Sequence, residues 1–126
     1  MVQILAVGIG GFIGSCFRFL LTKLLNIALP NFPFGTLMSN VIAALAIGFI
    51  IGIERQSGPI GDKSKLFLTT GLLGGLSTFS TFSMETIKMF EDGKYLTACG
   101  NIGLNLVLSL LFVMIGLQFA SFIKGN

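Results

Sequence analysis

The sequence predicts an all-α membrane protein whose single domain covers residues 1–126 and crosses the bilayer four times. Hydrophobic residues make up 53% of the chain and charged residues only 10%, and the mean hydropathy is +0.92. A soluble domain of this length needs a far more polar surface. The apolar residues also fall into long runs, with most charged side chains gathered between them. Lipid is therefore the expected solvent.

The predicted spans cover residues 4–25, 35–53, 66–84 and 95–123. A helix rises about 1.5 Å per residue, so each run is long enough to cross a hydrocarbon core of roughly 30 Å. The connections are short and carry turn residues: Pro30, Pro33, Gly58, Pro59, Gly61 and Gly93. Unpaired backbone groups are costly in lipid, and the runs lack the alternating polarity of barrel strands, so helices are expected.

The first span has no basic leader or cleavage site, so we expect it to remain in the mature chain. It carries Arg18, the one formal charge well inside a span. Three roles are open for this side chain: it snorkels to the interface, it caps interior carbonyl groups, or it raises the positive potential of a vestibule.

Small residues four positions apart favour close helix packing in membranes. Such pairs occur at Gly10 and Gly14, Gly48 and Gly52, and Gly71 and Gly75. They indicate that helices meet closely, but not which helices meet.

The third span combines glycines and hydroxyl residues from Thr69 to Ser83 at an unusual density. Glycine costs about 1 kcal/mol relative to alanine in a helix interior, and hydroxyl groups compete for backbone hydrogen bonds. We therefore predict that the third helix is broken at mid-span. A break would leave carbonyl and amide groups free to hold an ion in a protein-lined interior.

Further polar residues lie within the second and fourth spans. Thr97, Asn101, Asn105 and Ser109 follow each other at steps of four and therefore share one helical face, while Ser39 and Asn40 lie early in the second span. Asparagine is expensive in lipid unless it is paired or hydrated. These groups either bond helices together or line a pathway, and their concentration on one face favours a pathway.

The residue types restrict the chemistry. The chain has no histidine, its carboxylates lie outside the apolar runs or at their edges, and Cys16 and Cys99 form no metal or redox motif. An enzyme and a nucleic-acid partner are therefore not expected. Neutral hydroxyl and amide donors suit a small anion, and so do the electropositive edges of Phe79 and Phe82.

The basic residues are balanced across the predicted membrane. One side would hold Arg55, Lys63, Lys65 and Lys124, and the other Arg18, Lys23, Lys88 and Lys94. The bias that normally fixes orientation is thus absent, which favours insertion in both orientations and an antiparallel homodimer. Chance balance in a small sample is the alternative.

Three runs carry a family resemblance. GGLSTFSTFS, from Gly74 to Ser83, resembles the signature of the Fluc fluoride channels, also called the CrcB family, and GGFIGSCFR and GTLMSN are similar to that family's first two helices. The resemblance implies an antiparallel, dual-topology homodimer in the bacterial inner (cytoplasmic) membrane. Such a dimer would passively export fluoride from the cytoplasm through two pores, each lined by both subunits.

The resemblance also implies roles for individual residues. Asn40, Phe79 and Phe82 match pore residues, and Arg18 matches an arginine near the pore entrance. Gly74 and Ser77 match the helix break, where family members bind a structural sodium ion at the dimer centre through backbone carbonyls. The remaining residues expected to line the pore are Ser80, Ser83, Asn101, Asn105 and Ser109.

Two other functions fit a small four-helix chain. Small multidrug exporters have a similar length but rely on a glutamate in the first helix, which residues 4–25 lack. A non-transporting membrane scaffold would account for the small-residue pairs but not for the polar face or the paired phenylalanines.

Overall fold

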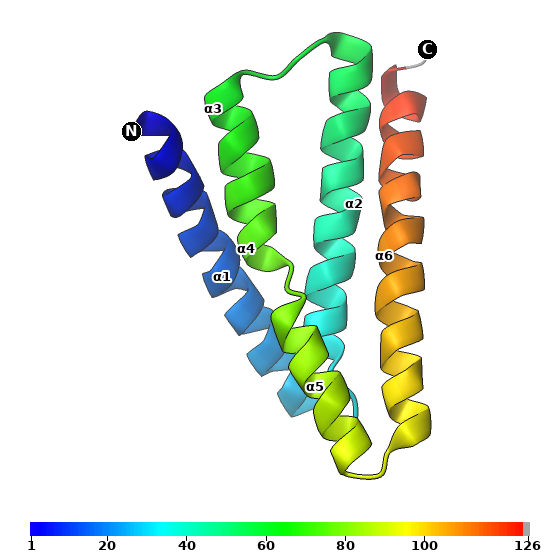
Figure 1. The fold of residues 1–126 in the computed structure, drawn as a ribbon. Coiled ribbons are helices and arrows are strands. Elements are labelled where there is room, and N and C mark those ends of the chain that lie inside the picture. Colours follow the sequence, from blue (N-terminus) through cyan, green and yellow to red (C-terminus); the bar gives the residue numbers. More distant parts are fainter. Residues whose placement is uncertain (125–126) are drawn as a thin grey trace.

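The computed structural model describes residues 1–124, which are helical with no strand in that range. Its elements are α1 (Val2–Ala28), α2 (Phe34–Ser57), α3 (Asp62–Lys65), the π-helix η1 (Leu66–Leu73), α4 (Gly74–Leu76), α5 (Ser80–Glu91) and α6 (Tyr95–Lys124) (Figure 1). The all-α prediction is confirmed.

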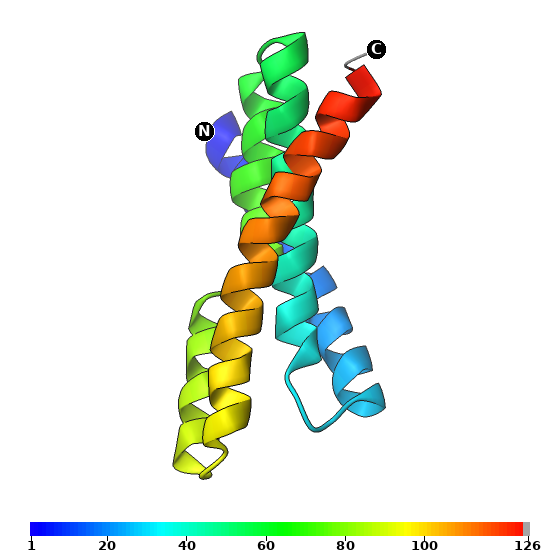
Figure 2. The same ribbon diagram turned by 90° about the vertical axis from the view of Figure 1, so that its right-hand side faces the viewer.

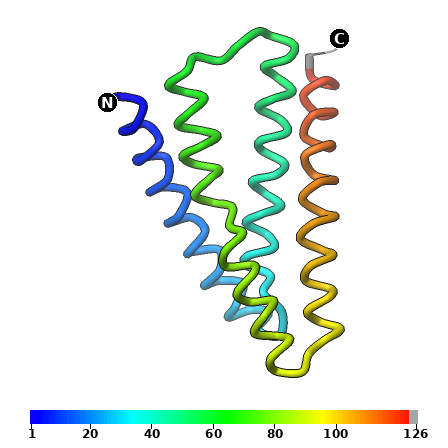
Figure 3. The backbone as a smooth tube through the Cα atoms, in the orientation of Figure 1, coloured from blue at the N-terminus to red at the C-terminus, as the bar shows by residue number. Residues whose placement is uncertain are grey.

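The chain passes four times along the long axis of the molecule (Figures 1 and 3). Within the described residues, three helices are long and apolar enough to cross a membrane: α1, α2 and residues Tyr95–Ile123 of α6. The predicted span 66–84 is instead shared among η1, α4 and α5. One end of the molecule holds the start of α1, the α2–α3 connection and the end of α6, as expected for a chain with an even number of passes.

The outer faces of the molecule are apolar, while its interior holds fully buried polar side chains beside a small apolar core. Phe12 on α1 and Phe122 on α6 are 72% and 74% exposed, while Ser39 and Asn101 are fully buried. This inverts the usual arrangement of a soluble protein, because lipid accepts apolar surface and leaves hydrogen bonds to be satisfied inside. The exposure pattern therefore agrees with a membrane environment.

Glycine residues end two of the helices. Gly58 follows α2 with a φ of 91°, and Gly93 follows α5 with a φ of 77°, a conformation that side chains disfavour. At the end of α5, the Gly93 amide donates to the Phe90 carbonyl and the Lys94 amide donates to the Met89 carbonyl. These are the two bonds of a Schellman motif, which satisfies the last carbonyls of the helix.

The helices pack as two close pairs. Helix α1 lies along η1 and α4, and α2 lies along α6, which crosses it at an angle in Figure 2. A Cβ added to Gly75 would lie 2.6 Å from the Gly11 carbonyl oxygen, and one added to Gly48 would meet the Val113 carbonyl. Only glycine permits these backbones to approach so closely, so the predicted small-residue pairs lie at the helix contacts.

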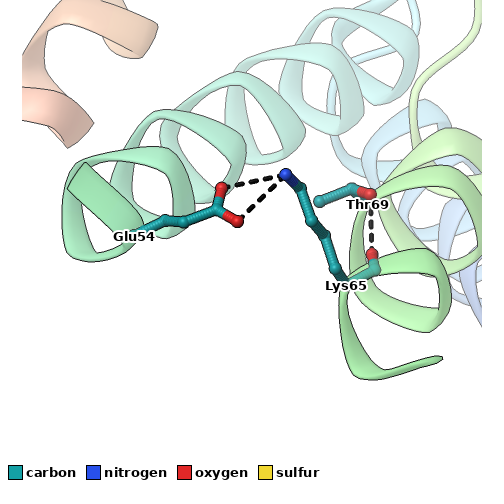
Figure 4. Close-up of polar contacts among 3 residues, drawn as sticks. All are labelled: Glu54, Lys65 and Thr69. Atoms are coloured by element: carbon teal, nitrogen blue, oxygen red, sulfur yellow. Dashed lines mark hydrogen bonds and ion pairs between the residues drawn. The ribbon is translucent and has the colours of Figure 1, made fainter. Parts of the chain in front are cut away.

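An ion pair links α2 to α3 at the end of the molecule where the connection between them is exposed (Figure 4). The Lys65 Nζ lies 3.0 Å from the Glu54 carboxylate, and the Thr69 hydroxyl donates to the Lys65 carbonyl at 2.7 Å. The lysine thereby ties the start of the third pass to the end of the second. Both charged side chains are partly exposed, so the contribution of the pair to stability is small.

Candidate functional site

The helical hydrogen-bond pattern of the third pass stops between Leu76 and Ser80. Ser77 has the extended dihedral angles φ −78° and ψ 154°, and its amide donates to the Leu73 carbonyl at 2.9 Å. The chain re-enters a helix at Ser80, where the Thr78 hydroxyl accepts a hydrogen bond from the Thr81 amide at 3.2 Å. This bond satisfies the Thr81 amide, one of the first-turn amides of α5 that have no partner within the helix.

Asn40 on α2 pairs with the backbone of Thr78. The Thr78 amide donates to Asn40 Oδ1 at 2.8 Å, and Asn40 Nδ2 donates to the Thr78 carbonyl at 3.2 Å. The asparagine carboxamide thus replaces the neighbouring peptide that a helix would have provided. Backbone groups that leave a helix inside a membrane protein need such a partner, which explains why an asparagine lies opposite these non-helical residues.

The hydrogen bonding continues from Asn40 across α6. Asn40 Nδ2 also donates to Asn105 Oδ1 at 3.0 Å, and Asn105 Nδ2 donates to Asn101 Oδ1 at 2.9 Å. Asn101 Nδ2 then donates to the Thr86 hydroxyl at 2.9 Å, and that hydroxyl donates to the Phe82 carbonyl at 2.7 Å. Asn101, Asn105 and Thr86 are 0%, 6% and 5% exposed, so this network lies in the interior.

A groove of about 820 Å³ runs beside this network, between η1, α2, α5 and α6. None of its lining residues within the described chain is charged. The predicted site residues that line it are Asn40, Gly74, Ser77, Phe79, Phe82, Ser83, Asn105 and Ser109. The fold therefore brings most of the predicted site together from three separate passes.

The two phenylalanines form a tilted pair at the start of α5. Their ring centroids are 5.6 Å apart with an interplanar angle of 49°, and Phe79 is 79% exposed. The first turn of α5 also directs its amide groups toward the non-helical residues 77–79, and the N-terminus of a helix carries a partial positive charge. Both rings line the groove beside this end of the helix.

The preceding half of the pass ends in carbonyl groups. Arg18 Nε donates to the Gly75 carbonyl at 3.0 Å, so the arginine lies at the C-terminal end of α4, where a cation is favoured. Within residues 1–124, the carbonyls of Gly74 and Ser77 accept no hydrogen bond. Unpaired carbonyl oxygens beside the non-helical residues are a kind of group that can hold a cation in a membrane protein.

Three predicted site residues do not line the groove. Arg18 lies on α1 against α4, Ser80 is exposed beside the groove, and Asn101 is wholly buried behind its wall. Asn101 shares the predicted face of α6, but that face is turned toward α5. The spacing of four placed it on the correct face without indicating that the face is covered.

The sequence did not indicate the roles of two threonines in the site or the burial of one carboxylate oxygen. Thr78 and Thr86 were two of many hydroxyl residues, and only the fold shows that they bond to Asn40 and Asn101. Glu85 Oε1 is buried without a hydrogen-bond partner among the described residues. No sequence signal distinguished this carboxylate from the others near span ends.

Side chains supply no conventional metal site in the described chain. Residues 1–124 contain no group of three or more His, Cys, Asp or Glu side chains that could hold a metal, and Cys16 and Cys99 are free and exposed.

Comparisons with known proteins match almost the whole chain. The family model described as "CrcB-like protein, Camphor Resistance (CrcB)" matches residues 5–117. A Clostridium novyi protein named fluoride-specific ion channel FluC is 48% identical over 120 residues, covering 92% of this chain and 91% of its own. A Clostridium perfringens protein of the same name is 50% identical over 118 residues, with the same coverage. A Methanosarcina acetivorans protein named fluoride-specific ion channel FluC 1 is 33% identical over 129 residues, covering 99% and 98%.

Proposed function

Because this chain belongs to the CrcB family, whose relatives named above are fluoride-specific ion channels, we propose that it is a membrane channel that conducts fluoride passively out of the cytoplasm. The observation that carries the proposal is the uncharged groove at the start of α5, which Phe79, Phe82 and Ser109 line. We place the channel in the bacterial cytoplasmic membrane.

The donors around the groove suit a small, strongly hydrated anion. The hydroxyl group of Ser109, the ring edges of Phe79 and Phe82, and the positive end of α5 can each replace part of the hydration shell. Arg18 adds a formal positive charge nearby while it caps the Gly75 carbonyl, which favours anions at the entrance. No carboxylate lines the groove to repel them.

We assign a path to residues on two passes. It runs along the face of α5 that carries Phe79, Ser80, Phe82 and Ser83 and past the groove-lining side of α6. Asn40, Asn105 and Ser109 complete the wall, while Asn101 supports it from behind. Neutral donors hold the ion only weakly, so it can move on, as conduction requires.

The functional unit is an antiparallel homodimer with two pores. Two features support this: the basic residues balance four against four across the membrane, and the groove opens sideways with Phe79 exposed. A second copy in the opposite orientation would cover that opening and supply the other wall of each path. The dimer requires no folding of the chain beyond what the subunit already has.

A structural sodium ion at the dimer centre fits the free carbonyls of Gly74 and Ser77. Two copies would offer four such oxygens, without any acidic side chain. In this arrangement sodium holds the two interrupted helices together and takes no part in fluoride transfer.

Passive export is sufficient for a cell exposed to fluoride. Hydrogen fluoride is a weak acid that crosses membranes in its neutral form and dissociates in the more alkaline cytoplasm. The trapped anion then leaves through a channel down its own gradient. This needs no energy source, in agreement with the absence of a nucleotide-binding motif from the sequence.

Growth of a fluoride-sensitive bacterium that lacks its own fluoride exporter tests the proposal in cells. Expression of this chain should restore growth in fluoride medium, and more so at acidic pH, where more hydrogen fluoride enters. Expression of Phe82→Ile at an equal membrane level is the matched control and should not restore growth. Equal growth with the empty vector and with the channel would count against the proposal.

A further inference from the structure

The hydrogen bonds among Thr78, α2, α6 and α5 form one directional relay that begins and ends on the third pass. The relay begins at the Thr78 amide, passes through the side chains of Asn40, Asn105, Asn101 and Thr86 in that order, and ends at the Phe82 carbonyl. Each asparagine accepts with its oxygen from the preceding group and donates with its nitrogen to the next. The direction is therefore the same at every step.

The relay encloses the first turns of α5. Its two ends, the Thr78 amide and the Phe82 carbonyl, flank Phe79, and Phe82 itself carries the second ring of the pair. The far side of the relay lies on α6 and is buried, with Asn101 0% exposed. The backbone turn that carries both rings is thus held by hydrogen bonds to α2 and α6, and the α6 side of this network is buried.

The side-chain amide hydrogens of Asn40 and Asn105 already donate to acceptors within the protein. Asn40 Nδ2 donates to both the Thr78 carbonyl and Asn105 Oδ1, and Asn105 Nδ2 donates to both the carbonyl and the side-chain oxygen of Asn101. Few donors remain for a passing ion. A hydrogen-bond chain of one direction is also polarised along its length, so the loss of one member weakens its neighbours.

From this geometry, and resting on the proposed function, we infer that Asn101 and Thr86 are positioning residues. They hold the aromatic turn of α5 in the conducting arrangement without touching the ion. Loss of the Thr86 hydroxyl leaves Asn101 Nδ2 without its acceptor and the Phe82 carbonyl without its side-chain donor. The Asn101 side chain then keeps only the bond that it accepts from Asn105, so the chain of bonds that reaches Asn40 and the Thr78 backbone is weakened.

The test compares Thr86→Val, which removes the hydroxyl at nearly constant shape, with Thr86→Ser, which keeps it. Ser39→Ala is the matched control, because it deletes another buried hydroxyl that donates to the carbonyl four residues earlier but lies outside the relay. Fluoride flux per folded channel is measured in liposomes, and amide exchange of the peptide covering residues 77–82 is measured in micelles.

We expect Thr86→Val to lower flux and to speed exchange at the Thr78 amide, each by about fivefold, the size of one lost hydrogen bond. Thr86→Ser should restore both, and Ser39→Ala should leave both unchanged even if it lowers the melting temperature equally. If the Thr78 amide hydrogen exchanges at the wild-type rate in Thr86→Val, the proposed relay is wrong.

Faster exchange with unchanged flux would confirm the linkage but overturn its role in conduction. A wild-type protein that conducts no fluoride would refute the proposed function, while the exchange data would still decide whether the relay exists.

Discussion

Replacing Asn40 with leucine, which branches at the same carbon, removes three hydrogen bonds. The Thr78 amide, the Thr78 carbonyl and Asn105 Oδ1 each lose their partner. A side-chain hydrogen bond within a membrane protein contributes about 0.6 kcal/mol on average, so three such bonds give about 2 kcal/mol. We therefore expect Asn40→Leu to destabilise the fold by about this amount and to abolish fluoride flux, because the Thr78 backbone no longer holds the start of α5.

Reversible unfolding in mixed micelles measures the change in the free energy of unfolding. Ser39→Ala is the reference variant, because it removes a single hydrogen bond. Ser39 makes one hydrogen bond, to the Gly35 carbonyl at 2.8 Å, and lies on the preceding position of the same helix. Its replacement should cost about one third as much as that of Asn40. Equal losses for the two variants, or full flux in Asn40→Leu, would refute the reasoning that this asparagine replaces a peptide partner.

Three further outcomes are expected. Phe82→Ile should lower fluoride flux at least about tenfold with the fold intact, because isoleucine fills space but offers no electropositive ring edge; liposome flux at equal protein incorporation is the readout, and wild-type flux would contradict the pore role. Gly75→Ala should destabilise by about 1–3 kcal/mol in thermal unfolding, because its Cβ would lie 2.6 Å from the Gly11 carbonyl oxygen, whereas Gly100→Ala, with no atom within 4 Å, should stabilise by up to about 1 kcal/mol through helix propensity. Replacing all sodium with a large organic cation should lower the melting temperature of the dimer and reduce flux, both restored by sodium addition; a melting curve independent of sodium would remove the case for a central ion.

The sequence predicts the helices far better than their partners. Long apolar runs and turn residues are local signals, and three of the predicted runs fall on α1, α2 and α6. The pairs at Gly10 and Gly14 and at Gly48 and Gly52 carry the same spacing on every helix, so they cannot indicate which helix each one contacts. The structure supplies that choice, because the carbonyls of Leu72 and Val113 occupy the space that a side chain would need.

The candidate site shows the same limit. Its residues came from a run of glycine and hydroxyl residues, a shared helical face and a family resemblance. The partners of Asn40 lie 38 and 65 positions away in the chain, at Thr78 and Asn105, and no local pattern specifies such bonds. Periodicity predicted the face that holds Asn101 but not that another helix covers it, since burial depends on packing between distant segments.

Fluoride efflux from liposomes that contain the purified protein tests the proposed channel most directly. Vesicles loaded with fluoride and chloride receive a potassium ionophore, and separate electrodes record the two anions, with protein-free vesicles as the background. We expect rapid fluoride release while chloride stays inside. Chloride release at the fluoride rate would contradict the proposed selectivity, and no fluoride release from a folded, sodium-loaded dimer would contradict the channel itself.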